Sequence, residues 1–164
     1  MHRVLYVFLP SWPIDRLRRA GLLPSRKNGA PPEEEAPFAT VMAAAGRQRL
    51  AAVNPAAVAK GLAAGMPLAD ALSFLPGLAT RPAEPAEDDA ALRRLAEWCG
   101  RYSPWTAADG MDGVKIEITG SAHLWGGEAE LAADLSRRLA RQCTAHRLAI
   151  ADTLGAAWAV ARYV

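Results

Sequence analysis

The feature that most constrains the fold is a short apolar run close to the start of the chain. Residues 4–9 read Val-Leu-Tyr-Val-Phe-Leu, and Pro10 follows directly. A run of this length with so little polar character is typical of a buried β-strand. Proline ends such a strand because it has no N–H group to donate to a central ladder. The chain is therefore expected to build part of its core on this strand.

Strand-like and helix-like segments alternate along the rest of the chain. Helical spacing of apolar residues is clearest at Leu92, Leu95 and Cys99, and again at Leu131 and Leu135. The order predicts an α/β or α+β fold, in which helices cover a sheet layer and a small helical insertion interrupts it near the N-terminus. Strands are expected at 40–44, 49–53, 79–83, 113–119 and 147–151, and helices at 14–20, 56–60, 67–74, 84–102, 128–141 and 154–163.

Composition bounds the size and setting of the protein. With 164 residues, 51% of them apolar and 22% charged, the chain can bury a real core and has room for one domain or two small ones. The longest apolar stretches fall short of the ~20 residues of a membrane-spanning helix, and the N-terminus lacks a signal-peptide pattern. We therefore expect a cytoplasmic protein without membrane contact. Cys99 and Cys143 are expected to be buried free thiols.

The basic residues are clustered, although the net charge of +2 is too small to prove a nucleic-acid partner. Arginine pairs well with phosphate because its planar guanidinium group makes two parallel hydrogen bonds. Phosphate contact is one interpretation of each cluster and a solvated helix face is the other, with the first cluster the stronger candidate. The first cluster comprises Arg16, Arg18, Arg19, Arg26 and Lys27, and the second comprises Arg137, Arg138 and Arg141.

Three stretches of the sequence resemble the palm and fingers of Y-family (translesion) DNA polymerases. Residues 3–19 resemble the first strand and following helix of that family. Residues 49–76 are similar to its fingers element, with a strand-ending Asn54 and a Gly-Met-Pro turn. Residues 109–128 are similar to a strand pair that ends in Thr-Gly. The three pieces lie in the family's order and at sensible separations.

The resemblance implies an α+β fold with the family's two parts. One part would be a ferredoxin-like palm sheet with covering helices, made by residues 1–10 and 76–164. The other would be a small, mostly helical fingers insertion at residues 11–75.

The metal-binding positions that the resemblance implies lack most of their ligands. Active relatives hold two divalent ions, roughly 4 Å apart, with carboxylates from neighbouring strands. The acid of the first strand and the metal contact two residues later fall on Phe8 and Pro10. The later Asp-Glu pair falls on Asp112 and Gly113, so Asp112 is the one acid that matches the family. No metal cofactor is therefore expected.

The positions that hold the nucleotide in the family are changed as well. A Tyr and an Arg that follow the strand-ending Asn fall on Pro55 and Val58, and a Lys of the last helix falls near Ala159. The aromatic residue that screens the sugar falls on Pro13. None of the four supplies the cationic or hydroxyl donor that a triphosphate needs. The two losses together resemble the catalytically degenerate, ImuB-type branch of the family.

This branch implies a non-catalytic subunit that acts as an adaptor in damage-inducible translesion DNA synthesis and mutagenesis. The partners it implies are DNA, an error-prone replicative-type polymerase, a RecA-like accessory protein and the sliding clamp. The place of action would be the nucleoid of a bacterial cytoplasm. The chain stops at Val164, about where the thumb of the family begins, so DNA binding is expected to be weak and to depend on Arg16, Arg18, Arg19 and Arg26.

Two alternatives stay open. The first is an active Y-family polymerase that uses Mg²⁺, which requires the first strand to be aligned differently. The second is an unrelated ferredoxin-like module that binds a metabolite or a protein. Such a module would have a palm-like sheet without the fingers insertion.

Overall fold

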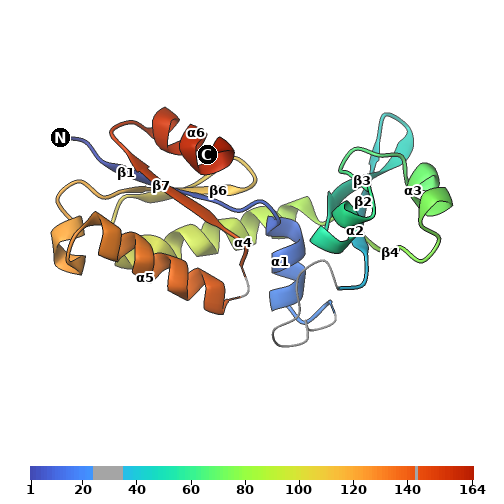
Figure 1. Cartoon of the computed structure of the whole chain (residues 1–164), viewed down its shortest axis with the longest axis horizontal. Helices are drawn as coiled ribbons and strands as arrows, with labels where there is room; N and C mark the ends of the chain where they lie inside the picture. The colour runs from blue at the N-terminus through green and yellow to red at the C-terminus, as the bar shows by residue number, and fades with distance from the viewer. Residues whose placement is uncertain (24–34, 143) are drawn as a thin grey trace. The chain divides into compact units, whose positions relative to one another are not determined.

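The structure is a computed structural model that describes residues 1–23, 35–142 and 144–164 (Figure 1). Arg26, Lys27 and Cys143, named in the predictions above, lie outside the described residues. The chain divides into two compact units. The larger unit comprises Met1–Trp12 with Ala86–Val164, and the smaller unit comprises Pro13–Pro85.

The larger unit is built on a four-stranded antiparallel sheet in the order β5-β6-β1-β7. The first apolar run forms β1, which pairs with β6 on one side and β7 on the other. Leu5 and Tyr6 point to opposite faces, and both are 0% exposed because helices cover both faces of the sheet. The strands are β1 (Val4–Phe8), β5 (Thr106–Asp109), β6 (Gly113–Glu117) and β7 (Arg147–Ala151).

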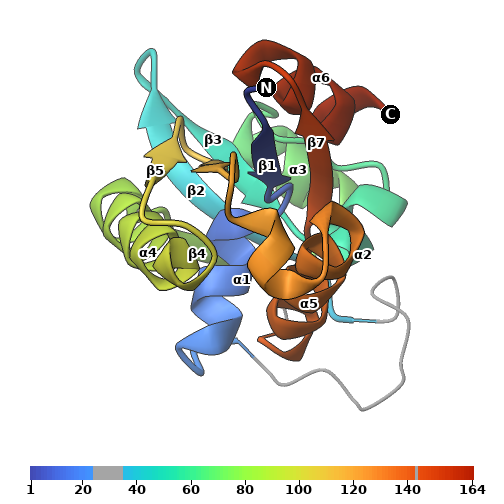
Figure 2. The ribbon, with the colours of Figure 1, turned by 90° about the vertical axis from the view of Figure 1, so that its left-hand side faces the viewer.

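Three helices of the larger unit cover its sheet (Figures 1 and 2). Leu5 and Val7 of β1 pack in one core cluster with the apolar stripes of α4 and α5. Tyr6 packs on the other face, with Ala157 and Ala161 of α6. The alternation along β1 therefore decides which residues lie under which helix. The helices are α4 (Pro85–Trp98), α5 (Glu128–Arg141) and α6 (Leu154–Tyr163).

The smaller unit holds a three-stranded sheet in the order β3-β2-β4. The expected hairpin joins β2 and β3, and it turns at Ala45 and Gly46, which have φ angles of 50° and 74°. Helix α1 starts at Trp12 in the larger unit and continues into the smaller one. The elements are α1 (Trp12–Arg19), β2 (Phe38–Ala44), β3 (Arg47–Val53), α2 (Pro55–Ala59), α3 (Leu68–Phe74) and β4 (Ala79–Pro82).

The compact units divide the chain differently from the boundaries proposed above. The sequence analysis placed residues 76–164 with the palm, but β4 pairs in parallel with β2 in the smaller sheet. The division therefore falls between Pro85 and Ala86, and on the N-terminal side between Trp12 and Pro13. Long-range pairing of this kind leaves no local signal, because a four-residue strand with an exposed pattern does not reveal its partner.

A buried asparagine joins β2 to α2 in the smaller unit. Asn54 Oδ1 accepts hydrogen bonds from the N–H groups of Ala57, at 2.9 Å, and Phe38, at 3.0 Å. Its Nδ2 donates to the carbonyl of Ala36, at 2.9 Å. Asn54 is thus the N-cap of α2, and Pro55 takes the first helical position, where its missing N–H group costs nothing.

Among the described residues, no helix is both long and apolar enough to cross a membrane.

Candidate functional site

The candidate site lies at the C-terminal end of β1, where it meets the N-terminal ends of β6 and β7. The register places Phe8 opposite Gly113 on one side and opposite Arg147 on the other. The N–H group of Leu9 donates to the carbonyl of Asp112, at 2.8 Å. The sheet thus brings together three of the four positions that the sequence analysis assigned to metal binding. Pro10, the fourth, follows β1 and is exposed.

An arginine from α6 binds the one acid that matches the family. Arg162 Nη1 donates to Asp112 Oδ2, at 3.2 Å, and Arg162 Nη2 donates to Asp112 Oδ1. This two-point contact is the strongest arrangement available to a guanidinium and a carboxylate. The hydrogen bonds that Arg162 donates to Asp112 raise the pKa of Arg162, so this side chain stays charged.

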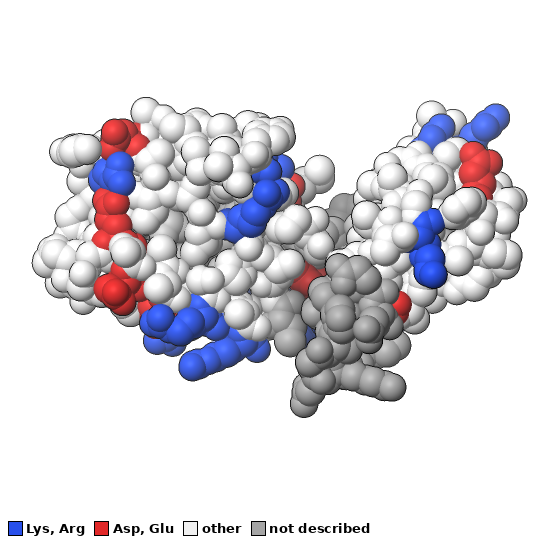
Figure 3. All heavy atoms as spheres, viewed as in Figure 1, with Lys and Arg blue, Asp and Glu red and all other residues white. Residues whose placement is uncertain are grey.

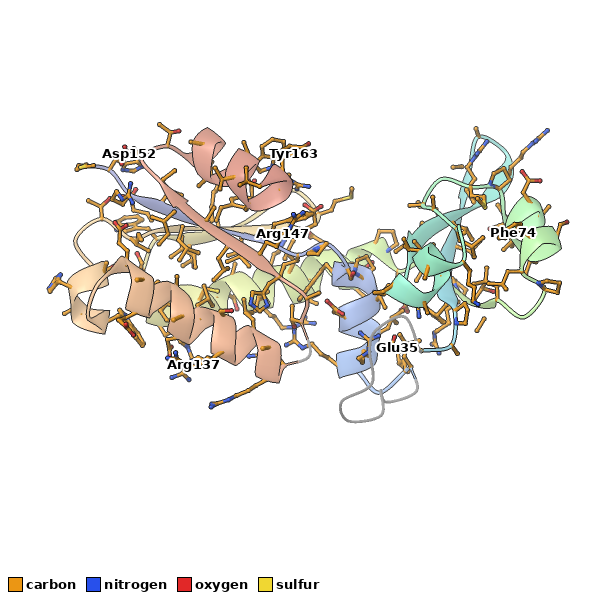
Figure 4. All side chains as sticks on the ribbon, in the orientation of Figure 1. Glu35, Phe74, Arg137, Arg147, Asp152 and Tyr163 are labelled. Atoms are coloured by element: carbon orange, nitrogen blue, oxygen red, sulfur yellow. The ribbon has the colours of Figure 1, made fainter. Side chains whose placement is uncertain are left out.

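The same guanidinium group lies against aromatic rings. Its Cζ atom is 4.5 Å from the centroid of the Phe8 ring and 4.9 Å from that of Trp158. The Cζ atom of Arg147, a residue that Figure 4 labels, is 5.1 Å from the centroid of the Phe8 ring. Arg147 Nη2 donates to the backbone carbonyl of Arg162, at 2.6 Å. Phe8, which the sequence predicts to stand at the place of the family's first acid, therefore serves as a surface for two cations.

A second acid of the site is also paired within the protein. Tyr6 Oη donates to Asp109 Oδ2, at 3.0 Å, and Lys115 Nζ lies 3.6 Å from Asp109 Oδ1. Burial raises the pKa of Tyr6 to about 12, and the hydrogen bond to Asp109 adds to the effect, so the phenol stays protonated at neutral pH. Tyr6 is therefore a hydrogen-bond donor.

Tyr6 also explains why position 113 carries a glycine. A Cβ atom built on Gly113 would lie 1.9 Å from Tyr6 Oη and 2.6 Å from Tyr6 Cζ. Such distances are far inside van der Waals contact, and the buried Tyr6 ring would have to move. A glutamate therefore cannot enter this position while Tyr6 keeps its place.

The donor set at the end of β1 does not fit a dinuclear Mg²⁺ site. Mg²⁺ requires several hard oxygen ligands. Phe8 and Gly113 offer no side-chain oxygen, and both carboxylate oxygens of Asp112 already accept from Arg162. Within the described part of the chain, no group of three or more His, Cys, Asp or Glu side chains could hold a metal ion.

The four predicted nucleotide positions are divided between the two units. Pro13, Pro55 and Val58 belong to the smaller unit, and Ala159 belongs to α6 of the larger one. Val58 is 55% exposed in the last turn of α2. None of these side chains carries a hydroxyl group or a positive charge, so none can bind phosphate oxygens as the family's donors do.

The arginines of the first predicted DNA-binding cluster differ in their surroundings. Arg16 donates to Glu84, at 2.9 Å. Arg18 donates to Asp15, at 3.0 Å, and to Glu35, at 2.7 Å, and its side chain is only 9% exposed. Arg19 is exposed in the last turn of α1, and Arg26 lies outside the described residues. Arg18 is thus held by acids of its own unit.

The second cluster lies on the solvent side of α5. Figure 3 shows basic side chains along this edge of the larger unit. Arg137 and Arg138 both contact Asp134, at 3.5 Å and 2.8 Å, and Arg141 is exposed in the last turn of the helix. One carboxylate is therefore shared by two of the three arginines.

Sequence reasoning missed Tyr6, Arg147 and Arg162. A signal existed for Arg162, because it is the one charged residue in the helical segment 154–163. A single charge on an otherwise apolar helix that covers a sheet is expected to have a partner. Tyr6 and Arg147 carried no comparable signal, since only the pairing of β1 with its neighbours places them beside Gly113 and Phe8.

Comparison with solved structures identifies the fold as that of Y-family DNA polymerases. The structure titled as a post-insertion binary complex of Dbh DNA polymerase matches with a TM-score of 0.75 and 16% sequence identity, over 97% of this chain and 45% of that chain. The structure of DinB from Sulfolobus solfataricus matches with a TM-score of 0.70, 16% identity and the same coverage. The α+β palm-type architecture expected from the sequence is thereby confirmed.

The family follows from the sequence itself. Residues 33–162 match the impB/mucB/samB family (IMS), and the chain belongs to this family. The chain is also similar to the protein ImuB from two strains of Caulobacter vibrioides, with 54% identity over 103 residues. The matched segment makes up 63% of this chain and 22% of the length of those relatives.

Proposed function

We propose that this chain belongs to a non-catalytic, Y-family polymerase-like subunit that acts as an adaptor in damage-inducible translesion DNA synthesis. The observation that carries the proposal is the contact of Arg162 with Asp112 and Phe8 at the end of β1. Support also comes from the family and from the similarity to ImuB. This membership sets aside the unrelated ferredoxin-like module.

The chemical argument rests on what nucleotidyl transfer requires. Two divalent ions must clamp the attacking and leaving oxygens, and the protein must supply carboxylates to hold them. At the corresponding place this chain has an aromatic ring, a glycine and an aspartate that is paired with an arginine. We infer that it uses no metal cofactor and does not extend a primer.

An adaptor acts through its partners. The partners proposed are DNA, an error-prone replicative-type polymerase, a RecA-like accessory protein and the sliding clamp, at the nucleoid of a bacterial cytoplasm. The chain spans 45% of the solved polymerase chains that it resembles, and the matched segment spans 22% of the ImuB relatives. Contacts with several of these partners are therefore not assigned to the residues described above.

The proposal is tested by separating chemistry from function in cells. A deletion strain is complemented with the whole gene carrying Asp112→Asn, and the frequency of damage-induced mutation is measured beside the wild type. Asp109→Asn serves as the matched control, because Asp109 is also paired with a cation at this end of the sheet. We expect both variants to retain wild-type mutagenesis, since neither carboxylate performs chemistry.

A parallel measurement uses the purified protein with primed DNA, deoxynucleotides and Mg²⁺ or Mn²⁺, and an active Y-family polymerase as the positive control. We expect no primer extension. If the wild type extends the primer and Asp112→Asn abolishes both extension and mutagenesis, the chain is an active translesion polymerase and the adaptor proposal is wrong.

A further inference from the structure

We propose that the guanidinium group of Arg162 is the resident cation of the site at the end of β1, and that it excludes divalent metal ions by occupying Asp112. The inference deepens the proposed non-catalytic function and rests on it. It assigns a role to Arg162, and it explains how a single acid is kept at the end of β1.

The first step is the pairing of Asp112 with Arg162. Its two carboxylate oxygens accept from two different nitrogens of Arg162. The Arg162 side chain is 20% exposed and the Asp112 side chain 35% exposed, so the pair is partly shielded from water. A metal ion would have to compete with this fixed, two-point cationic partner for the carboxylate of Asp112.

The second step is the packing of aromatic rings against the guanidinium group of Arg162. Phe8 and Trp158 contact the guanidinium group at 4.5 Å and 4.9 Å, and Arg147 donates to the backbone carbonyl of the same residue. An aspartate at position 8 would be a second carboxylate beside this cation, whereas an aromatic ring offers a flat surface for it. The replacement of the first acid by Phe8 and the presence of Arg162 are therefore parts of one arrangement.

The third step is the balance of charge. The contacts at this end of the sheet join two carboxylates, Asp109 and Asp112, with three cations, Lys115, Arg147 and Arg162. The sum of these charges is +1, since −2 is added to +3. A divalent cation would be repelled by the excess and would have to compete with a protein cation at each acid.

The fourth step is steric. Tyr6 fills the space that a side chain at Gly113 would need, with its hydroxyl group 1.9 Å from the ideal Cβ position. Returning a carboxylate to position 113 therefore does not rebuild a metal site while Tyr6 is present. The metal is therefore excluded in two independent ways. Arg162 excludes it by its positive charge, and Tyr6 excludes it by filling the space that a ligand at position 113 would need.

The test combines metal binding with unfolding in four proteins: wild type, Arg162→Gln, Asp112→Asn and the double variant. Mn²⁺ binding is followed by calorimetry and by paramagnetic broadening of NMR signals near β1. Arg137→Gln is the matched control, because Arg137 also contacts an aspartate but lies on α5. Circular dichroism verifies that each variant keeps the fold.

We expect wild type and Arg137→Gln to show no saturable Mn²⁺ binding at Asp112. Arg162→Gln should bind Mn²⁺ with an affinity at least about tenfold above the upper limit that the wild-type titration sets, and the added Asp112→Asn should remove that gain, because a carboxylate relieved of its counter-ion becomes a ligand. In urea, the cycle of the four proteins should show a coupling of about tenfold in the unfolding equilibrium constant, as for residues in direct contact.

Arg162→Lys provides a second variant if Arg162→Gln fails to fold. It keeps the charge but lacks the two-point contact, so we expect it to exclude Mn²⁺ and to lose most of the coupling with Asp112. The inference is overturned if the wild type binds Mn²⁺ as tightly as Arg162→Gln, or if the cycle shows no coupling. Primer extension by the wild type would instead contradict the proposed function, whatever the unfolding cycle shows.

Discussion

Tyr6 and Gly113 depend on each other at the level of single atoms. The hydroxyl group of Tyr6 stays in place because it is buried and donates to Asp109. That position is available only because residue 113 has no Cβ atom. A glycine that appears in the sequence as a lost carboxylate is thus required by the packing of the neighbouring strand.

The replacement of Gly113 by alanine tests this dependence. We expect Gly113→Ala to lower the free energy of unfolding by about 1–3 kcal/mol, because the new methyl group forces the Tyr6 ring to move. Gly155→Ala is the matched control, since Gly155 lies in α6 with nothing within 4 Å of its ideal Cβ position. Alanine there should be neutral or stabilising by up to about 1 kcal/mol. Equal effects of both substitutions in urea denaturation would contradict the steric explanation.

At the scale of elements, helix termini and strand ends are joined by a few polar side chains. Asn54 holds the start of α2 and the start of β2 with one buried amide group. Thr153 caps α6 with a single hydrogen bond of 3.2 Å at an exposed position. The two caps therefore differ in how many backbone groups depend on them.

Alanine at each cap measures this difference. We expect Asn54→Ala to destabilise the protein by about 2–3 kcal/mol, because it leaves the buried N–H groups of Phe38 and Ala57 without this acceptor and also removes the hydrogen bond to the carbonyl of Ala36. Thr153→Ala should cost about 0.5–1 kcal/mol. Asn54→Asp keeps the accepting oxygen and loses the donor to Ala36, so its cost in stability should lie between those of Asn54→Ala and Thr153→Ala. Chemical denaturation followed by circular dichroism compares them, and a cost for Asn54→Ala no larger than that for Thr153→Ala would contradict the dual role.

At the scale of the whole molecule, charge governs the expected contact with DNA. The net charge is +2, and several arginines of the predicted DNA-binding clusters contact carboxylates within their own unit. Arg18 is the clearest case, because its 9% exposed side chain is held by Asp15 and Glu35. We therefore expect Arg18 to stabilise the smaller unit and not to contact DNA.

The salt dependence of DNA binding distinguishes these roles. We expect weak binding of primed DNA that falls steeply with salt, because each neutralised phosphate releases condensed counter-ions. Arg19→Gln should reduce the slope of log K against log salt by about 1. Arg18→Gln should leave the slope unchanged and lower the melting temperature. Arg93→Gln is the control for loss of an exposed arginine, because the Arg93 side chain on α4 is 72% exposed. Tight binding that does not respond to Arg19→Gln would indicate base stacking in place of phosphate contact.

Most of the elements could be predicted from the sequence because their signals are local. The apolar run of β1, the leucine stripe of α5 and the alanine-rich segment of α6 each reveal their structure within a few residues. Strand β5 was missed, because its four half-buried residues have no apolar alternation. The sequence likewise predicts, from the family resemblance, that Phe8 and Gly113 stand where active relatives carry acids, since this prediction needs only the identity of single positions.

The contents of the site were decided by tertiary structure. Arg162 is 50 residues from Asp112 in the sequence, and Tyr6 is 103 residues from Asp109. No local pattern encodes which cation pairs with which acid. The pairing depends on the antiparallel register of β1 with β6 and β7, and on the packing of α6 against these strands. Residue identities alone predict that carboxylates are missing, whereas only the folded chain reveals that Arg162 pairs with Asp112 and that Tyr6 fills the space beside Gly113.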